Sequence, residues 1–225
     1  MEVRGVNRDF IKRMIVSAAA ALMCVTACSH AGRWPNATIP YMLIGFDENE
    51  TGILLASMFL WEQATGVNFK NVLFEDNDDD ASVLHIMKGN GEFGVAGISI
   101  CGYEEDKLLL VVMNEVTPEA AVHELGHVLG LEHEHQRPDR DDYITINWEN
   151  IDADAAMLLQ FVAKQPNNYN YREYPYDYFS CMHYANKAAA RDPRMDTIVS
   201  PVPVGVYGIP SKIDIRKVRA IQGTD

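Results

Sequence analysis

Apolar and polar positions alternate along the chain in a way that predicts helices interspersed with short strands. Residues 50–66 predict a helix that Gly66 closes, because apolar side chains recur there at helical spacing. Its core-facing positions are Leu54, Met58, Trp61 and Thr65. Short apolar runs bounded by polar turns predict strands at 42–46, 67–69, 83–87, 98–101 and 108–112, of which the last two form an adjacent pair.

The amino-terminal 28 residues predict a targeting signal and not a part of the fold. Four basic residues precede an apolar run at 14–27, which is too short to span a bilayer comfortably. Val25-Thr26-Ala27-Cys28 resembles the bacterial lipobox, in which a peptidase cuts before a cysteine that carries acyl chains. We therefore expect a signal peptide over 1–27, lipidation of Cys28 and anchoring in a bacterial cell envelope. Ordinary secretion after cleavage at Ala31 is the alternative, and both routes export the protein.

Composition narrows the function further. The chain has 225 residues, of which 48% are hydrophobic and 23% are charged, so it can bury the core of one globular domain. Its 19 basic residues against 32 acidic ones give a formal charge of −13, which argues against a nucleic-acid partner. The four cysteines form no C-x-x-C pair, so the ligands of any metal must be histidine nitrogens and oxygens.

The strongest chemical signal is His123-Glu124-Leu125-Gly126-His127. Thr117 and Pro118 predict the start of the helix that carries it, because a hydroxyl caps the first turn and proline fits the first helical position. Residues at i and i+4 lie on one helix face, so His123 and His127 can reach one zinc ion with Glu124 beside it. A glycine inside a helix costs about 1 kcal/mol against alanine, so Gly126 indicates close packing behind the site.

The residues that follow extend this pattern into H-E-x-x-H-x-x-G-x-x-H. Gly130 can adopt positive φ, end the helix and turn the chain so that His133 arrives as a third ligand. Further along, Ser180-Cys181-Met182-His183-Tyr184 places Met182 in the position of the Met-turn that lies under zinc in metzincins. The remaining histidines, His30, His85, His135 and His183, are expected to be structural or exposed.

At these residues the sequence resembles the astacin family of zinc endopeptidases. The resemblance runs through residues 123–151, returns at 176–184, and includes the opening at 33–41 and a last helix at 211–222. It implies an α+β zincin fold in two lobes beside an active-site cleft, with a twisted mixed sheet in the upper lobe and a largely irregular lower lobe. The implied organisation is a short tether at 28–33 and a catalytic domain at 34–225, divided at about residue 133.

The resemblance also implies the site. His123, His127 and His133 would bind one Zn²⁺, Glu124 would act as general base on a metal-activated water, and Tyr184 would be a distant fifth ligand. Three neutral imidazoles leave the charge of zinc uncompensated, which lowers the pKa of water and polarises a carbonyl. A phenol that leaves the metal can donate to the developing oxyanion. The implied partner is a protein or peptide substrate.

Several features depart from the family. Only residues 29–33 separate Cys28 from the domain, so we expect no pro-segment. In relatives a freed amino terminus pairs with the glutamate after the third histidine, here Glu134. A terminus whose nitrogen is acylated has no such charge, so we expect Glu134 to be satisfied by another cation or by water, with Arg137 or Arg140 nearby in sequence.

Other departures concern the cysteines and the substrate. The family's usual disulfides have no matching pairs, and pairing of Cys101 with Cys181 stays open. The strand that pairs with substrate is expected near 94–101. Lys187, Arg191 and Arg194 are basic candidates for contacting the substrate side chain after the scissile bond.

Two other functions remain open. One is a catalytically silent zincin that binds peptides at the cell surface. The other is a structural lipoprotein in which zinc only holds the fold together, which predicts a closed site of four ligands.

Overall fold

A computed structural model of the chain describes residues 32–72, 83–91, 97–105, 109–152, 155–164 and 173–224. The expected signal peptide, Cys28 and His30 lie outside these residues. Within them, no helix has both the length and the apolar character needed to cross a bilayer.

The described strands of the first half of the chain form a mixed sheet in the order β2-β1-β3-β5-β4. Their bounds are β1 Thr38–Ile44, β2 Asn68–Asn71, β3 Leu84–Lys88, β4 Gly97–Ser99 and β5 Leu110–Met113. All neighbours pair in parallel except β4, which runs antiparallel to β5 at the edge of the sheet. The expected adjacent strand pair is therefore confirmed, with its ends shifted by one or two residues.

The first strand begins earlier than the sequence predicted, at Thr38 instead of residue 42. Proline cannot donate to a ladder of hydrogen bonds, so Pro40 is an unfavourable residue inside a strand. The register explains why it is tolerated: Thr38–Tyr41 pairs with β2, whereas pairing with β3 starts only at Tyr41. Pro40 therefore lies where β1 has a neighbour on one side only.

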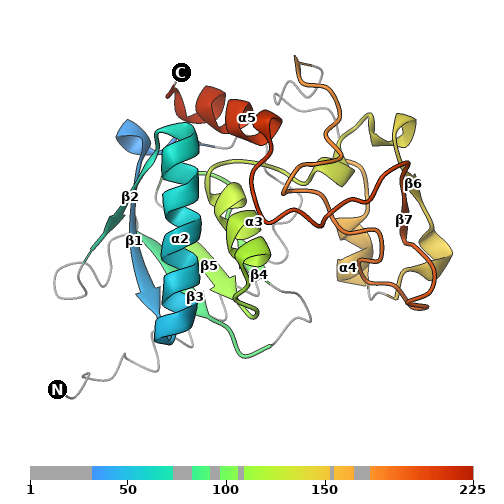
Figure 1. Cartoon of the computed structure of the whole chain (residues 1–225), viewed down its shortest axis with the longest axis horizontal. Coiled ribbons are helices and arrows are strands. Elements are labelled where there is room, and N and C mark those ends of the chain that lie inside the picture. The colour runs from blue at the N-terminus through green and yellow to red at the C-terminus, as the bar shows by residue number, and fades with distance from the viewer. Residues whose placement is uncertain are drawn as a thin grey trace.

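Two helices, α2 (Glu48–Thr65) and α3 (Pro118–Val128), pack together against the sheet (Figure 1). Asp47 and Glu50 form a capping box at the start of α2, and Gly66 ends it at φ 78°. Trp61 is fully buried and its indole N–H donates to the carbonyl oxygen of Val122 at 3.1 Å, which fixes α2 to α3. The four predicted core positions of α2 are all buried.

The chain between α3 and the last helix lies to the right in Figure 1 and contains a second hydrophobic cluster. Its buried members are Ile144, Ile146, Ile151, Phe161, Tyr176, Ile198 and Val204. Regular elements are short here: the strand pair β6 (Thr145–Ile146) and β7 (Ile198–Val199), the helix α4 (Ala155–Gln160) and three 3₁₀ turns at Glu134–Gln136, Arg140–Asp142 and Trp148–Asn150. The expectation of a largely irregular second lobe holds, although α4 was not foreseen.

The last helix, α5 (Lys212–Gln222), returns to the first cluster and packs on α2. Ser211 caps it and Asp214 completes a capping box. At the far end, the side chain of Gln222 accepts a hydrogen bond from Trp34 N at 3.0 Å and donates one to Leu129 O at 3.0 Å. The predicted final helix is thus confirmed, and it ties the start of the domain to its end.

Candidate metal centre

Helix α3 presents His123 and His127 on one face. Thr117 Oγ1 accepts a hydrogen bond from Ala120 N at 3.2 Å, and Pro118 is the first helical residue, as the sequence predicted. The rings of His123 and His127 are 4.8 Å apart between centroids. This spacing places both imidazoles in one cluster.

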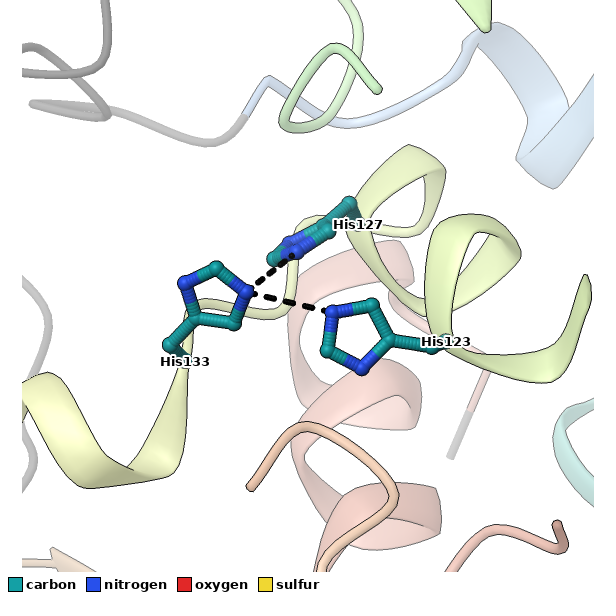
Figure 2. Close-up of side chains that lie close together, drawn as sticks. All are labelled: His123, His127 and His133. Atoms are coloured by element: carbon teal, nitrogen blue, oxygen red, sulfur yellow. Dashed lines mark hydrogen bonds between the residues drawn. The ribbon is translucent and has the colours of Figure 1, made fainter. Parts of the chain in front are cut away.

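A tight turn after α3 brings in the third imidazole. Gly130 has φ 97°, and its N–H donates to His127 O at 2.8 Å. This left-handed conformation favours glycine, so the predicted role of Gly130 is confirmed. The chain then doubles back and His133 Nε2 lies 3.1 Å from Nε2 of both His123 and His127 (Figure 2).

Hydrogen bonds on the other side of each ring fix its protonation. Nδ1 of His123 lies 2.8 Å from Cys181 O, and Nδ1 of His127 lies 2.7 Å from Leu131 O. A carbonyl oxygen can only accept, so both Nδ1 atoms carry the proton.

His133 Nδ1 lies 3.0 Å from Gln136 Oε1. The Gln136 amide is itself oriented, because its Nε2 donates to the carbonyl oxygens of Leu159 and Val162 at 3.3 Å. The same reasoning therefore gives His133 a proton on Nδ1.

The three Nε2 atoms consequently direct lone pairs at one another. Burial lowers the pKa of His123, His127 and His133, so the rings are neutral at neutral pH. Three converging lone pairs repel unless a cation lies between them. Zinc fits this donor set, since bonds of about 2.0–2.1 Å to imidazole at tetrahedral angles separate the nitrogens by roughly 3.3 Å. The three imidazoles are the one potential metal-binding group among the described residues.

Glu124 lies on α3 between two of these histidines and is 6% exposed. The edge strand passes against it, since a Cβ on Gly97 would lie 2.5 Å from Glu124 Oε1. Ser99 Oγ donates to Glu124 O at 3.1 Å, which holds β4 against the helix. Burial raises the pKa of Glu124 to about 8, and a nearby dication would act in the opposite direction.

Gly126 and Met182 meet directly behind the histidines. A Cβ on Gly126 would lie 2.5 Å from Met182 Sδ and 3.4 Å from Trp61 Cζ2. Met182 is 1% exposed. The expectation that Gly126 marks close packing is confirmed, and its neighbour is the predicted Met-turn methionine.

Tyr184 lies beside the cluster. Its ring centroid is 4.6 Å from that of His133, and the ring stacks on His135 at 4.2 Å. Burial raises the pKa of the Tyr184 phenol, and the charge of Glu124 raises it further, so the hydroxyl stays protonated at neutral pH.

The other described histidines are buried, as expected of structural residues. His135 Nε2 lies 2.9 Å from Gln160 O, and His183 Nε2 lies 2.8 Å from Tyr176 OH. His85 lies on β3 within the sheet. None of them belongs to the potential metal-binding group of the described residues.

Glu134 pairs with two cations, of which only Arg137 was among the residues expected from the sequence. Arg137 donates to its Oε1 at 3.0 Å, and Lys217 of α5 donates to its Oε2 at 2.7 Å. Arg140, the other predicted neighbour, instead donates to the carbonyl oxygens of His135 and Phe161. No local signal could have found Lys217, which lies 83 residues away.

The remaining sequence expectations have mixed outcomes. Cys101 and Cys181 form no disulfide with each other. Lys187 and Arg191 donate to backbone carbonyls of their own lobe, and Arg194 pairs with Asp192. These interactions give the three basic candidates a structural explanation and leave their predicted contact with substrate untested.

Comparisons with known proteins identify a family of peptidases. The family model described as Astacin, a family of peptidases, matches residues 27–221. Bone morphogenetic protein 1 of Xenopus laevis is 34% identical over 175 residues, which cover 74% of this chain and 22% of that protein. Zinc metalloproteinase nas-8 of Steinernema carpocapsae is 36% identical over 186 residues, which cover 81% of this chain and 41% of that protein. The chain thus spans less than half the length of either relative.

Solved structures extend the comparison to the fold. High choriolytic enzyme 1, a hatching enzyme zinc-protease from Oryzias latipes, superposes with a TM-score of 0.70 at 26% identity. The match covers 88% of this chain and 98% of that one. Myroilysin matches with a TM-score of 0.53 at 18% identity, which supports the fold alone.

Proposed function

Because this chain belongs to the astacin family of peptidases, we propose that it is a zinc-dependent endopeptidase that hydrolyses peptide bonds in extended protein or peptide segments. The observation that carries the proposal is the convergence of three neutral Nε2 atoms beside the buried carboxyl group of Glu124. Such a site can bind a divalent cation through the three nitrogens and can transfer a proton through the carboxyl group of Glu124.

Each residue has a role in this proposal. His123, His127 and His133 hold Zn²⁺, which when bound supplies Lewis acidity and lowers the pKa of water. Glu124 accepts a proton from the attacking water and returns it to the leaving amine. Tyr184, whose phenol stays protonated, donates a hydrogen bond to the oxyanion. Met182 packs behind the ligands.

The edge strand β4 supplies the place for substrate. Its antiparallel pairing with β5 uses one edge and leaves no further strand beside it in the described sheet. An extended peptide can add to such an edge through main-chain hydrogen bonds. Since Gly97 of β4 packs on Glu124, a peptide added here would run past the proposed base.

The three-ligand cluster argues against a purely structural zinc site. Closed structural sites have four protein ligands, whereas the metal-binding group of the described residues has three, all from histidine and all partly exposed. A catalytically silent zincin that binds peptides remains the alternative function, and only an activity measurement separates it from the peptidase.

We further propose that the enzyme works outside the cytoplasm. The apolar run before Cys28 supports export, and the lipobox-like segment 25–28 supports a lipid anchor in a bacterial envelope. Secretion after cleavage at Ala31 is the competing proposal.

The test combines metal analysis with hydrolysis of a denatured protein. We expect the wild type to bind one zinc ion per chain and to cleave the substrate. Glu124→Ala should retain zinc and lose activity by about 10²–10⁴, because a general base contributes that much and is not a ligand. Glu119→Ala, which removes an exposed acid from the same helix, is the control and should leave activity unchanged. Activity of Glu124→Ala within tenfold of wild type would refute the assignment.

A further inference from the structure

The carboxylate of Glu124 is not the only buried acid near the metal centre; Glu134, directly after His133, is 2% exposed. Lys217 on α5 donates to its Oε2 at 2.7 Å and is itself only 4% exposed. Burying two charges is costly unless they pair closely. An ion pair this deep between segments 83 residues apart holds the two segments in one relative position.

The Glu134 end of this pair belongs to the turn that carries the third imidazole. Glu134 N donates to Met182 O at 3.1 Å, and its Oε1 accepts a hydrogen bond from Asp177 N at 2.9 Å. The same 3₁₀ turn, Glu134–Gln136, contains the amide that accepts the Nδ1 proton of His133. A shift of Glu134 would therefore move both the His133 backbone and the group that orients its ring.

The other end of the pair belongs to a helix that also contacts the opposite side of the metal centre. Asp214, one turn before Lys217 on α5, is fully buried and accepts from Ser180 Oγ at 2.7 Å and from Cys181 N at 3.0 Å. The carbonyl oxygen of Cys181 in turn accepts the Nδ1 proton of His123. One face of α5 thus reaches the supports of two ligands, His123 through Asp214 and His133 through Lys217.

The surrounding charges make Lys217 the partner that decides the position of Glu134. Arg137 also contacts Glu134, but it forms two hydrogen bonds of 2.9 Å with Asp139 that keep its own charge compensated. Without Lys217, the Oε2 atom would lose its cation at a site closed to water. The carboxylate would then have to turn, and the 3₁₀ turn would move with it.

We propose that Lys217 is a positioning residue of the metal centre, which acts through Glu134 to hold His133 and Gln136 in the arrangement that binds zinc. The inference rests on the proposed function for the identity of the metal, and it concerns metal affinity before catalysis. Residues that support metal ligands typically contribute 10–100-fold to affinity. Because Lys217 acts one residue further away, we expect its loss to weaken zinc binding by about tenfold.

The experiment measures the zinc dissociation constant of the full chain by competition with a chelator, together with the absorption spectrum of the cobalt(II) form. Lys217→Met should weaken zinc binding about tenfold and change the cobalt spectrum, whereas Lys217→Arg should restore most of the affinity. Lys212→Met, an exposed change of the same kind on the same helix, is the matched control and should alter neither.

A second variant separates positioning from folding stability. Lys217→Met leaves a buried carboxylate short of one cation and can unfold the chain, whereas Glu134→Gln with Lys217→Met removes both charges of the pair. The proposal requires the double variant to fold and still bind zinc about tenfold more weakly than wild type. Unchanged zinc affinity and an unchanged cobalt spectrum in the double variant would overturn it. Hydrolysis by the wild type tests the proposed function separately, since the affinity of each variant is read without any turnover.

Discussion

Gly126→Ala tests whether the packing behind the metal centre is as close as the structure indicates. The new Cβ would lie 2.5 Å from Met182 Sδ and 3.4 Å from both Met182 Cε and Trp61 Cζ2. Ordinary non-bonded carbon contacts are about 3.5–4.0 Å, so the sulfur must move by roughly 1 Å. Met182 and Trp61 are both buried, which leaves little room for that movement.

The magnitude follows from two opposing effects. Overpacking of a core costs about 1–3 kcal/mol, and replacing glycine by alanine inside a helix returns about 1 kcal/mol. We therefore expect a net loss of up to about 2 kcal/mol, which lowers Tm by up to roughly 8 °C for a chain of this size. The assay is thermal unfolding of the metal-free chain, so that changes in zinc affinity do not contribute.

Gly52→Ala is the matched control, because Gly52 also lies inside a helix but a Cβ there meets nothing within 4 Å. Only the helix propensity changes at that position, so Tm should rise. Adding Met182→Ala to Gly126→Ala removes the clashing sulfur, and the double variant should be destabilised less than the sum of the two single variants. A rise in Tm for Gly126→Ala equal to that of Gly52→Ala, or strict additivity in the double variant, would refute the close contact.

Three further outcomes can be measured. Tyr184→Phe should lower kcat by about 10²–10³ with little change in KM, because it removes one oxyanion donor and keeps the ring; steady-state kinetics would contradict this role if only KM changed. Gln136→Ala removes the acceptor of the His133 Nδ1 proton and should weaken zinc binding about 10–100-fold in chelator competition, and unchanged affinity would contradict the orienting role. Cys28→Ser should move the protein from the membrane fraction to the soluble fraction with its activity intact. Mass spectrometry decides this point, since an unmodified terminus at Gly32 would contradict the anchor.

The parts of the site that the sequence predicted are those encoded within a few turns of backbone. The helix start at Thr117, the shared face of His123 and His127, and the positive φ of Gly130 all follow from local preferences. The predicted start of β1 was wrong: the strand begins at Thr38 and not at residue 42, and it includes Pro40, whose local preference against strands is overridden by its place in the sheet. The strands that lie beside a proline are set by the tertiary fold. No local pattern in a single sequence indicates them.

The orientation of the ligand side chains depends on contacts between residues that are far apart in the sequence. The nitrogen that faces the metal is set by the acceptor on the other side of each ring, and for His123 that acceptor is the backbone of Cys181, 58 residues away. A backbone carbonyl is present at every residue, so no side-chain pattern could mark this one. The same limit applies to Lys217, which looks like any lysine on an amphipathic helix until the fold brings it to Glu134. The motif therefore specifies which atoms can bind the metal, whereas the returning helix α5 and the Met-turn specify the direction in which two of those atoms point. Variants in α5 should consequently affect the metal centre more than their distance from the motif in sequence would indicate.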